Sequence, residues 1–171
     1  MEKTVTYSLI SYQGWSFYIA ATDEGLCFVG AMPASKSECL NWISSNIDNS
    51  KVVYDKEALK PYETAFYSYI DGDSTDFELP VLQIGTSFQK KIWNSLRTVP
   101  YGQTITYSEL AERSGLDSKA ARAVGSAIGK NPLLIIYPCH RVVPKTGKPR
   151  AFRGGLQMKE ALLELERNYS S

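Results

Sequence analysis

The stretch of sequence that decides the fold covers residues 107–130 and reads YSELAERSGLDSKAARAVGSAIGK. Its first part predicts a short helix that ends at Gly115, because glycine readily adopts the backbone conformation that follows a helix end. Asp117 or Ser118 is placed to cap a second helix over about residues 119–128. Two helices joined by a glycine-containing turn predict a helix-turn-helix, in which the second helix is the one that reads DNA.

The second predicted helix has a basic and unusually small surface. Lys119, Arg122 and Lys130 supply positive charge, and most of the other residues, among them Ala121 and Ser126, are small. Small side chains let a helix lie close against another surface, and the scarcity of carboxylates favours contact with phosphate groups. The alternative interpretation is a helical hairpin packed within the protein, since such hairpins occur in many proteins that bind no nucleic acid.

Charge is divided unequally between the two halves of the chain, although the net charge is only +1. Residues 1–85 carry five Lys/Arg against twelve Asp/Glu, a net charge of −7, and residues 86–171 carry fourteen against six, a net charge of +8. A basic half of this kind predicts a polyanionic partner. Attraction between the two halves of one fold is the alternative explanation.

Composition is typical of a globular protein, with 43% hydrophobic and 22% charged residues among 171. No apolar stretch approaches the ~18 residues of a membrane-spanning helix, and the first residues lack a signal-peptide pattern. We therefore expect a cytoplasmic protein, or a nuclear one if the cell has a nucleus, with no membrane partner. Three irregularly spaced cysteines and a single histidine predict neither a disulfide framework nor a metal site.

Two domains are predicted, covering residues 1–85 and 86–171. The first is expected to be an α/β module in which nothing suggests catalysis. Its predicted strands cover residues 7–12, 15–20, 25–30 and 77–81, and its predicted helices cover residues 35–46 and 59–70. The second domain is expected to be mostly helical, with further helices over about residues 87–97 and 158–168.

A candidate nucleophile lies in the motif Pro138-Cys139-His140-Arg141-Val142, which holds the only histidine of the chain. The apolar run before it, residues 133–137, predicts a buried strand. The thiolate is the reactive form of cysteine, and a nearby imidazole lowers the pKa of a thiol. A carboxylate from the last helix would complete a cysteine–histidine–acid set, and the spacing does not choose among Glu160, Glu164 and Glu166.

Other interpretations of this motif remain open from the residues alone. A buried and inert cysteine is one of them, since most buried cysteines are unreactive. A cysteine–histidine hydrolase is another; it needs an oxyanion hole and a base in direct contact with the thiol, and it gives the basic half no role. A DNA-binding regulator with an inert cysteine is the third, and it would bind DNA by sequence.

The motif at residues 138–143 resembles the active-site motif of the O6-alkylguanine-DNA alkyltransferases, the methylated-DNA–protein-cysteine methyltransferases. Further segments match in the family's order and near its spacing: residues 88–93, 99–102, Tyr107, residues 119–125, Asn131-Pro132 and Gly154-Gly155-Leu156. The resemblance is strong over residues 86–168 and loose over the first half. It implies an α/β N-terminal module with a ribonuclease-H-like fold (a small sheet plus helices), followed by a mostly α C-terminal domain with a winged helix-turn-helix.

The resemblance implies a DNA repair protein that removes the alkyl group from O6-alkylguanine in double-stranded DNA, and less well from O4-alkylthymine. The group would pass to Cys139 in an irreversible SN2 reaction, once per chain, after the base is flipped out of the duplex. The family implies no cofactor, binding through the minor groove and a monomeric state. Some relatives bind zinc in the first half, but those ligands are absent here. Alkyltransferase-like relatives lack the reactive cysteine, so Cys139 argues against a purely binding role.

The resemblance also implies a role for each matching residue. Cys139 would be the nucleophile and alkyl acceptor, and His140, through a water, and Glu166 would stabilise its thiolate. Asn131 would hold the turn and hydrogen-bond into this network. Tyr107 would donate a proton or a hydrogen bond to the departing guanine.

The remaining implied roles concern DNA and the substrate pocket. Arg122 would enter the base stack in place of the flipped nucleotide. The other expected DNA contacts are Lys119, Ala121, Ser126, Lys130 and Arg141, and the expected pocket residues are Tyr107, Val142, Phe152 and Arg153. Many relatives have Tyr and a small residue where this chain has Phe152 and Arg153, so the size of alkyl group that fits is left open.

Overall fold

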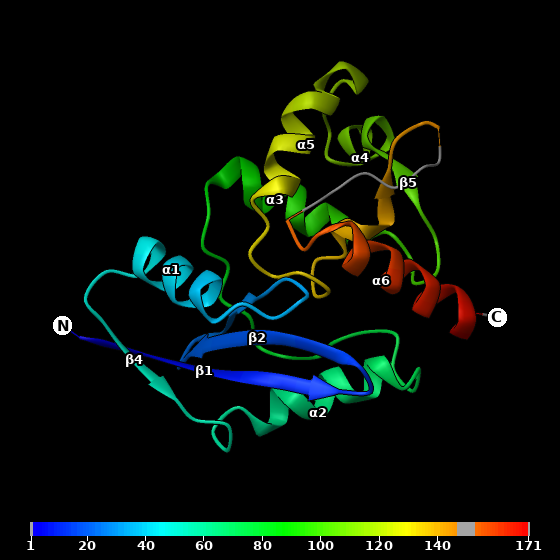
Figure 1. The fold of residues 1–171 in the computed structure, drawn as a ribbon. Helices are drawn as coiled ribbons and strands as arrows, with labels where there is room; N and C mark the ends of the chain where they lie inside the picture. The colour runs from blue at the N-terminus through cyan, green and yellow to red at the C-terminus, as the bar shows by residue number, and fades with distance from the viewer. Residues whose placement is uncertain (1, 147–152, 171) are drawn as a thin grey trace. The chain divides into compact units, whose positions relative to one another are not determined.

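The fold is that of a computed structural model, which describes residues 2–146 and 153–170. The chain forms two compact units, residues 1–84 and 85–171. The first unit is a four-stranded mixed sheet with two helices, and the second unit is mostly helical (Figure 1). An α/β module is therefore followed by a mostly α module, as the sequence predicts.

The sheet of the first unit is built around a hairpin. β1 (Lys3–Tyr12) and β2 (Trp15–Thr22) are antiparallel, and the two residues that join them, Gln13 and Gly14, have φ of 51° and 84°. Two consecutive residues with positive φ match the twist of paired strands, so the strands predicted over residues 7–12 and 15–20 form a hairpin. β3 (Gly25–Val29) pairs with β2, and β4 (Ser50–Tyr54) pairs in parallel with β1, which gives the order β3-β2-β1-β4.

The two helices of the first unit lie on opposite faces of this sheet (Figure 1). Val5 of β1 packs in a buried cluster with Cys39 of α1 (Lys36–Asn46). Ser8 points to the other face and donates a hydrogen bond to Glu63 of α2 (Lys60–Ile70) at 2.8 Å. Alternate residues of one strand thus meet different helices.

One strand predicted for the first unit is wrong. Residues 77–81 form no ladder and contribute only an isolated bridge between Leu26 and Val81. Pro80 has no backbone N–H to donate to a longer ladder, which explains the difference. Conversely, β4 is a strand that the sequence pattern does not predict.

The second unit contains four helices in its described part: α3 (Ser87–Leu96), α4 (Tyr107–Arg113), α5 (Ala121–Gly129) and α6 (Leu156–Tyr169). α3 and α4 each begin with a capping box, formed by Thr86 with Gln89 and by Thr106 with Glu109. The helix predicted over residues 119–128 is confirmed but divided, because a 3₁₀ turn, η1 (Ser118–Ala120), precedes α5. Trp93 donates from Nε1 to the carbonyl of Ala127 at 2.9 Å and thereby fixes α5 against α3.

Two short strands complete the second unit. β5 (Ile105–Thr106) pairs in parallel with β6 (Val142–Val143), which directly follows the 3₁₀ turn η2 (Cys139–Arg141). The cysteine motif is therefore tied to the start of α4, which follows β5 without a break. Within the described residues, no helix combines the length and the apolar character that crossing a membrane requires.

Candidate active site

The segment that leads to Cys139 is a series of tight turns, so the strand predicted over residues 133–137 is wrong. Ile136 N–H donates to Leu134 at 2.8 Å across Ile135, whose φ of 73° lies in the left-handed region. Cys139 N–H donates to Tyr137 at 2.7 Å across Pro138, whose φ and ψ of −77° and 67° define an inverse γ-turn. A β-branched residue such as Ile135 is rarely found at positive φ, and such strain occurs mainly where surrounding structure enforces it.

Asn131 is the residue that enforces these turns. It is fully buried, its Nδ2 donates to the carbonyl of Tyr137 at 2.9 Å, and its Oδ1 accepts from Leu133 N–H at 3.0 Å. A run of apolar residues alone would favour an extended strand, but one buried amide that bonds both ends of the run bends it into a compact loop. The loop delivers Cys139 to the first position of η2.

Cys139 is buried, and its surroundings both raise and lower the pKa of its thiol. Burial raises the pKa of its thiol, while a hydrogen bond from Asn131 and the positive charges of Arg153 and Lys159 act in the opposite direction. The thiol is therefore protonated at neutral pH, and a base must remove the proton before the sulfur can attack.

His140 directly follows Cys139 and is the candidate for that base. Its Nε2 lies 2.7 Å from Oε2 of Glu166, and both side chains are buried. Burial lowers the pKa of His140, and the charges of Arg141 and Lys159 add to this effect against the opposing pull of Glu166. We assign a neutral imidazole. An ionised carboxylate only accepts hydrogen bonds, so Nε2 carries the proton. Nδ1 is then an acceptor, and it is buried with no hydrogen-bond partner among the described residues.

Glu166 is the carboxylate that the fold brings to His140, whereas Glu160 and Glu164 are exposed. Its Oε1 also accepts from the backbone N–H of Gly102 at 3.2 Å. Gly102 has φ of 81°, and a Cβ there would come within 2.7 Å of the Ser170 Cβ, so this contact requires glycine. Burial alone would raise the pKa of Glu166, but hydrogen bonds from His140 and Arg141 hold it well below its usual range.

Arg141 does not have the surface position that a DNA contact needs, so that prediction is wrong. Its Nε and Nη2 donate to the two oxygens of Glu166 at 2.8 and 2.9 Å, and its Nη1 donates to the Val99 carbonyl at 2.7 Å. Its guanidinium also lies 5.7 Å from the centre of the Tyr101 ring. Arg141 is buried because it balances the charge of a buried carboxylate, which a charged group in the interior requires.

Lys159 is a site residue that the sequence reasoning missed. It is 1% exposed, and its Nζ donates to the carbonyl of Val142 at 2.8 Å. Its positive charge lowers the pKa of the Cys139 thiol, against the larger effect of burial. The helix periodicity indicates the burial of Lys159, because it falls on one buried stripe of α6 with Leu162 and Glu166.

The predicted DNA-contacting residues other than Arg141 gather on and just before α5. Lys119, Arg122, Ser126 and Lys130 are exposed, and Ala121 is half-buried. The spacing of the four exposed residues places them along one side of the segment that runs from η1 to the end of α5. This side is opposite Val124, Ala127 and Ile128, which are buried.

The residues predicted to line a substrate pocket differ in their placement. Tyr107 is half-buried at the start of α4, and its ring lies 3.8 Å from where a Cβ on Gly125 of α5 would be. Val142 is fully buried in β6. Arg153 donates from Nε to the Asn131 carbonyl at 2.8 Å, so its charge stands at the loop that carries Cys139. Phe152 lies outside the described residues.

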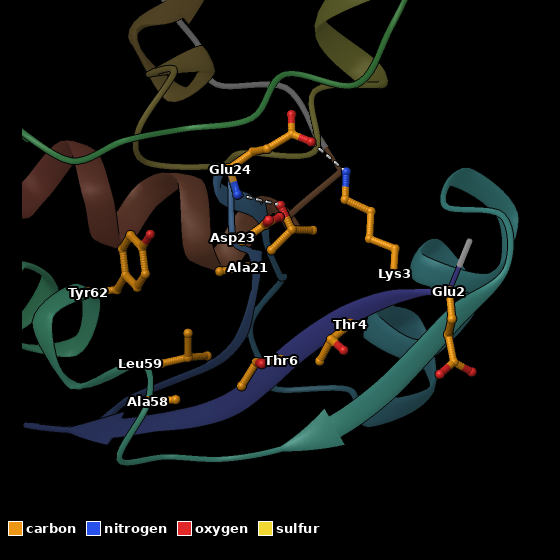
Figure 2. Close-up of a pocket in the computed structure, with 11 residues that line it drawn as sticks. Glu2, Lys3, Thr4, Thr6, Ala21, Asp23, Glu24, Ala58, Leu59 and Tyr62 are labelled. Atoms are coloured by element: carbon orange, nitrogen blue, oxygen red, sulfur yellow. Dashed lines mark hydrogen bonds and ion pairs between the residues drawn. The ribbon is translucent and has the colours of Figure 1, made fainter.

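A pocket of about 770 Å³ lies on the first unit, but none of the residues around Cys139 lines it. Figure 2 shows its lining, with Thr4 and Thr6 of β1 and an ion pair between Lys3 and Glu24 at 2.7 Å. Both partners of this pair reach solvent. Among the described residues of the whole chain, no three His, Cys, Asp or Glu side chains gather closely enough to hold a metal ion.

The geometry around Cys139 is that of a candidate cysteine nucleophile supported by a histidine–glutamate pair. Residues 87–168 match the family model described as 6-O-methylguanine DNA methyltransferase, DNA binding domain. The chain is 43% identical over 170 residues to the inducible methylated-DNA–protein-cysteine methyltransferase of Bacillus subtilis, covering 99% of this chain and 94% of that protein. It is also 43% identical over 162 residues to the methylated-DNA–protein-cysteine methyltransferase of Methanosarcina barkeri, covering 95% of this chain and 97% of that protein. The chain belongs to the methylated-DNA–protein-cysteine methyltransferase family.

A solved structure, described as Mycobacterium tuberculosis OGT in complex with DNA, is similar over both modules of the chain. It has 32% sequence identity and a TM-score of 0.81, covering 96% of this chain and 94% of that one. The similarity thus includes the first half, where the sequence motifs alone gave only a loose match.

Proposed function

We propose that this chain repairs DNA by moving the alkyl group of O6-alkylguanine onto the sulfur of its own Cys139. The observation that carries the proposal is the buried pair of His140 Nε2 and Glu166 Oε2, 2.7 Å apart, in which His140 directly follows this cysteine in sequence. The pair fixes the imidazole so that Nδ1 is the basic atom. A neutral, oriented base beside a protonated buried thiol is what a cysteine nucleophile needs.

The reaction balances without a cofactor. The Cys139 thiol gives its proton toward His140, through a bridging water. The sulfur forms a bond to the alkyl carbon as the bond between that carbon and O6 breaks. Tyr107 gives its proton to the guanine, which then leaves as the neutral base, and the proton released from the Cys139 thiol restores the phenol by way of solvent. The positive charges of Lys159 and Arg153 stabilise the thiolate while it exists.

The product explains why each chain acts once. A thioether is stable in water, so the alkyl group stays on the sulfur. Cys139 is 1% exposed, so an alkylated base within a duplex must leave the stack to reach it, at a cost of about a few kcal/mol. We assign Arg122 to the space that the base vacates, because it is exposed on α5 and its long side chain is cationic.

The DNA surface in this proposal is a winged helix-turn-helix made of α4, η1 and α5, with the β5–β6 pair beside it. The exposed cations Lys119, Arg122 and Lys130 would meet phosphates, and the small residues of α5 would allow a close approach to the minor groove. The DNA named in the description of the Mycobacterium tuberculosis structure supports DNA as the partner. O4-alkylthymine is the second and poorer substrate in this proposal.

The stoichiometry of repair tests the proposal. A duplex with one O6-methylguanine is supplied in excess over the protein, and the repaired guanine is counted by chromatography of the hydrolysed DNA. We expect one repaired base per chain, and none with Cys139→Ser. A double variant, Cys27→Ser with Cys39→Ser, is the matched control and should repair one base per chain, because those two thiols are buried with pKa values raised to about 12. Many repaired bases per chain would exclude transfer to the protein.

A further inference from the structure

Arg153 is a cation placed at the loop that carries the reactive cysteine. Its Nε donates to the carbonyl of Asn131 at 2.8 Å, and its Nη2 donates to the carbonyl of Pro132 at 3.3 Å. The side chain of Asn131 hydrogen-bonds the Cys139 thiol and the Tyr137 carbonyl. One fully buried residue therefore holds the guanidinium at its backbone and the sulfur at its side chain, which keeps the two groups close together.

The positive charge of Arg153 acts at the sulfur. Both of these carbonyl partners are neutral, so the hydrogen bonds orient the guanidinium without cancelling its charge. Arg153 and Lys159 both lower the pKa of the Cys139 thiol by their charge, and the effect of Arg153 is the larger. The buried carboxylate of Glu166 is paired with Arg141 instead. The surroundings of the sulfur are therefore electropositive.

Arg153 is the more accessible of the two cations. Lys159 is 1% exposed and its Nζ donates to the Val142 carbonyl, whereas Arg153 is half-buried and reaches solvent. Cys139 is itself 1% exposed, so an alkylated base comes to it from the solvent side. A substituent on that base therefore meets Arg153 rather than Lys159.

We propose that Arg153 binds a carboxylate on the O6 substituent of the damaged guanine, so that this chain favours anionic groups such as carboxymethyl over neutral groups of the same shape. This inference rests on the proposed alkyl transfer and adds the class of alkyl group that the site prefers. Such a carboxylate is ionised at neutral pH, and an ion that enters a protein interior needs a partner of opposite charge. Hydrogen bonds between a guanidinium and a carboxylate are about twice as strong as neutral ones.

The transfer of a carboxymethyl group needs no additional reactant. The sulfur of Cys139 forms a bond to the CH₂ carbon as the bond between that carbon and O6 breaks. The guanine leaves with the proton of Tyr107, and the thiol proton restores the phenol by way of solvent. The carboxylate keeps its charge throughout. The product is a carboxymethyl thioether on Cys139, with its carboxylate beside Arg153.

Transfer rates from matched substrates test this role of Arg153. Three duplexes of one sequence carry O6-methylguanine, O6-carboxymethylguanine or its neutral counterpart O6-carbamoylmethylguanine, and single-turnover rate constants are measured with protein in excess. Loss of the charge in Arg153→Gln makes the thiolate harder to form, which should slow all three reactions alike. The carboxymethyl reaction should slow by about a further tenfold, because it also loses its ion pair. The ratio of the carboxymethyl rate to the carbamoylmethyl rate therefore isolates contact with the substituent.

Other variants separate charge from fold. Arg153→Lys keeps the charge and should keep most of the wild-type ratio. Arg153→Ser introduces a small residue, as many relatives have there, and is the second neutral variant if Arg153→Gln does not fold. Arg167→Gln, an equal loss of charge at an exposed position of α6, is the control and should leave the ratio unchanged.

The outcomes distinguish this inference from the proposed function. An unchanged ratio in a folded neutral variant of Arg153 would overturn the inference, and so would a wild type that transfers methyl but not carboxymethyl. Both results would leave methyl transfer to Cys139 intact. A wild type that takes up no group from any of the three duplexes would instead refute the proposed function.

Discussion

Replacing Glu166 by glutamine should destabilise the protein strongly, because this carboxylate balances the charge of its site. It accepts hydrogen bonds from His140, from two nitrogens of Arg141 and from Gly102 N–H, and it is 1% exposed. A glutamine oxygen can accept some of these bonds, but its amide nitrogen only donates and would face donors. Arg141 would keep its charge in the interior with no anion beside it. Stranding a buried charge in this way costs about 3–5 kcal/mol.

The measurement is the free energy of unfolding by urea, followed by circular dichroism at pH 7. Glu164→Gln, on the same helix but exposed, is the matched control and should change stability by less than about 0.5 kcal/mol. In a double variant, Arg141→Met should remove much of the cost of Glu166→Gln, because no stranded cation remains. A loss below about 1 kcal/mol for Glu166→Gln would refute the charge-balance argument.

The stability of the wild type and that of Glu166→Gln should depend differently on pH. The pKa of Glu166 in the fold lies well below its usual range, whereas an unfolded glutamate has a pKa of about 4.3. Because the pKa is lower in the folded state, the ionised carboxylate stabilises the fold fully at pH values above the unfolded pKa. This stabilisation is lost as the pH falls from the unfolded pKa to the folded pKa. The stability difference between wild type and Glu166→Gln should therefore be constant between about pH 7 and pH 5.5 and should shrink near pH 3. A difference that does not depend on pH would contradict the assignment of an ionised Glu166.

Three further substitutions test single roles in the reaction. Lys159→Met keeps the bulk of the side chain but removes a cation near Cys139, so the rate of alkyl transfer should reach its plateau at higher pH; an unchanged pH profile would contradict this role. Arg122→Ala should slow repair of a duplex more than reaction with the free alkylated base, and equal losses would argue against its entry into the base stack. Tyr107→Phe should slow transfer by about 10²-fold at unchanged DNA affinity, and a wild-type rate would remove the proton-donor role.

Local signals in the sequence were sufficient for most of the second unit. One of the two caps offered for the second helix of the pair, Asp117, is the one used, since its side chain accepts the Lys119 N–H at 2.8 Å. The amphipathic repeat of the last helix predicted its existence and extent to within two residues at its start and one at its end. Capping and periodicity act within one helix turn, so they can be read without knowledge of the rest of the fold.

The misread parts depend on contacts between residues far apart in sequence. The run 133–137 has the composition of a strand, but the buried amide of Asn131 bonds both of its ends. Arginine is expected at the surface, and only the ion pair with Glu166, 25 residues away in sequence, explains why Arg141 is buried. Neither of these partners can be chosen from spacing alone.

Two further features were missed because their own residues are ambiguous. β4 is short and contains a lysine, so its pattern does not separate it from a loop, and only its pairing with β1 makes it a strand. Lysine is rarely buried, and the burial of Lys159 depends on its hydrogen bond to the Val142 carbonyl.

The central claim is that the alkyl group ends on Cys139 and stays there. The most direct measurement is the intact mass of the protein after incubation with a duplex that contains one O6-methylguanine, followed by peptide mapping. The account predicts a single gain of about 14 Da, located on Cys139 and saturating at one group per chain. An unchanged mass while the duplex loses its methyl groups would contradict it, and so would a methyl group found on any other residue.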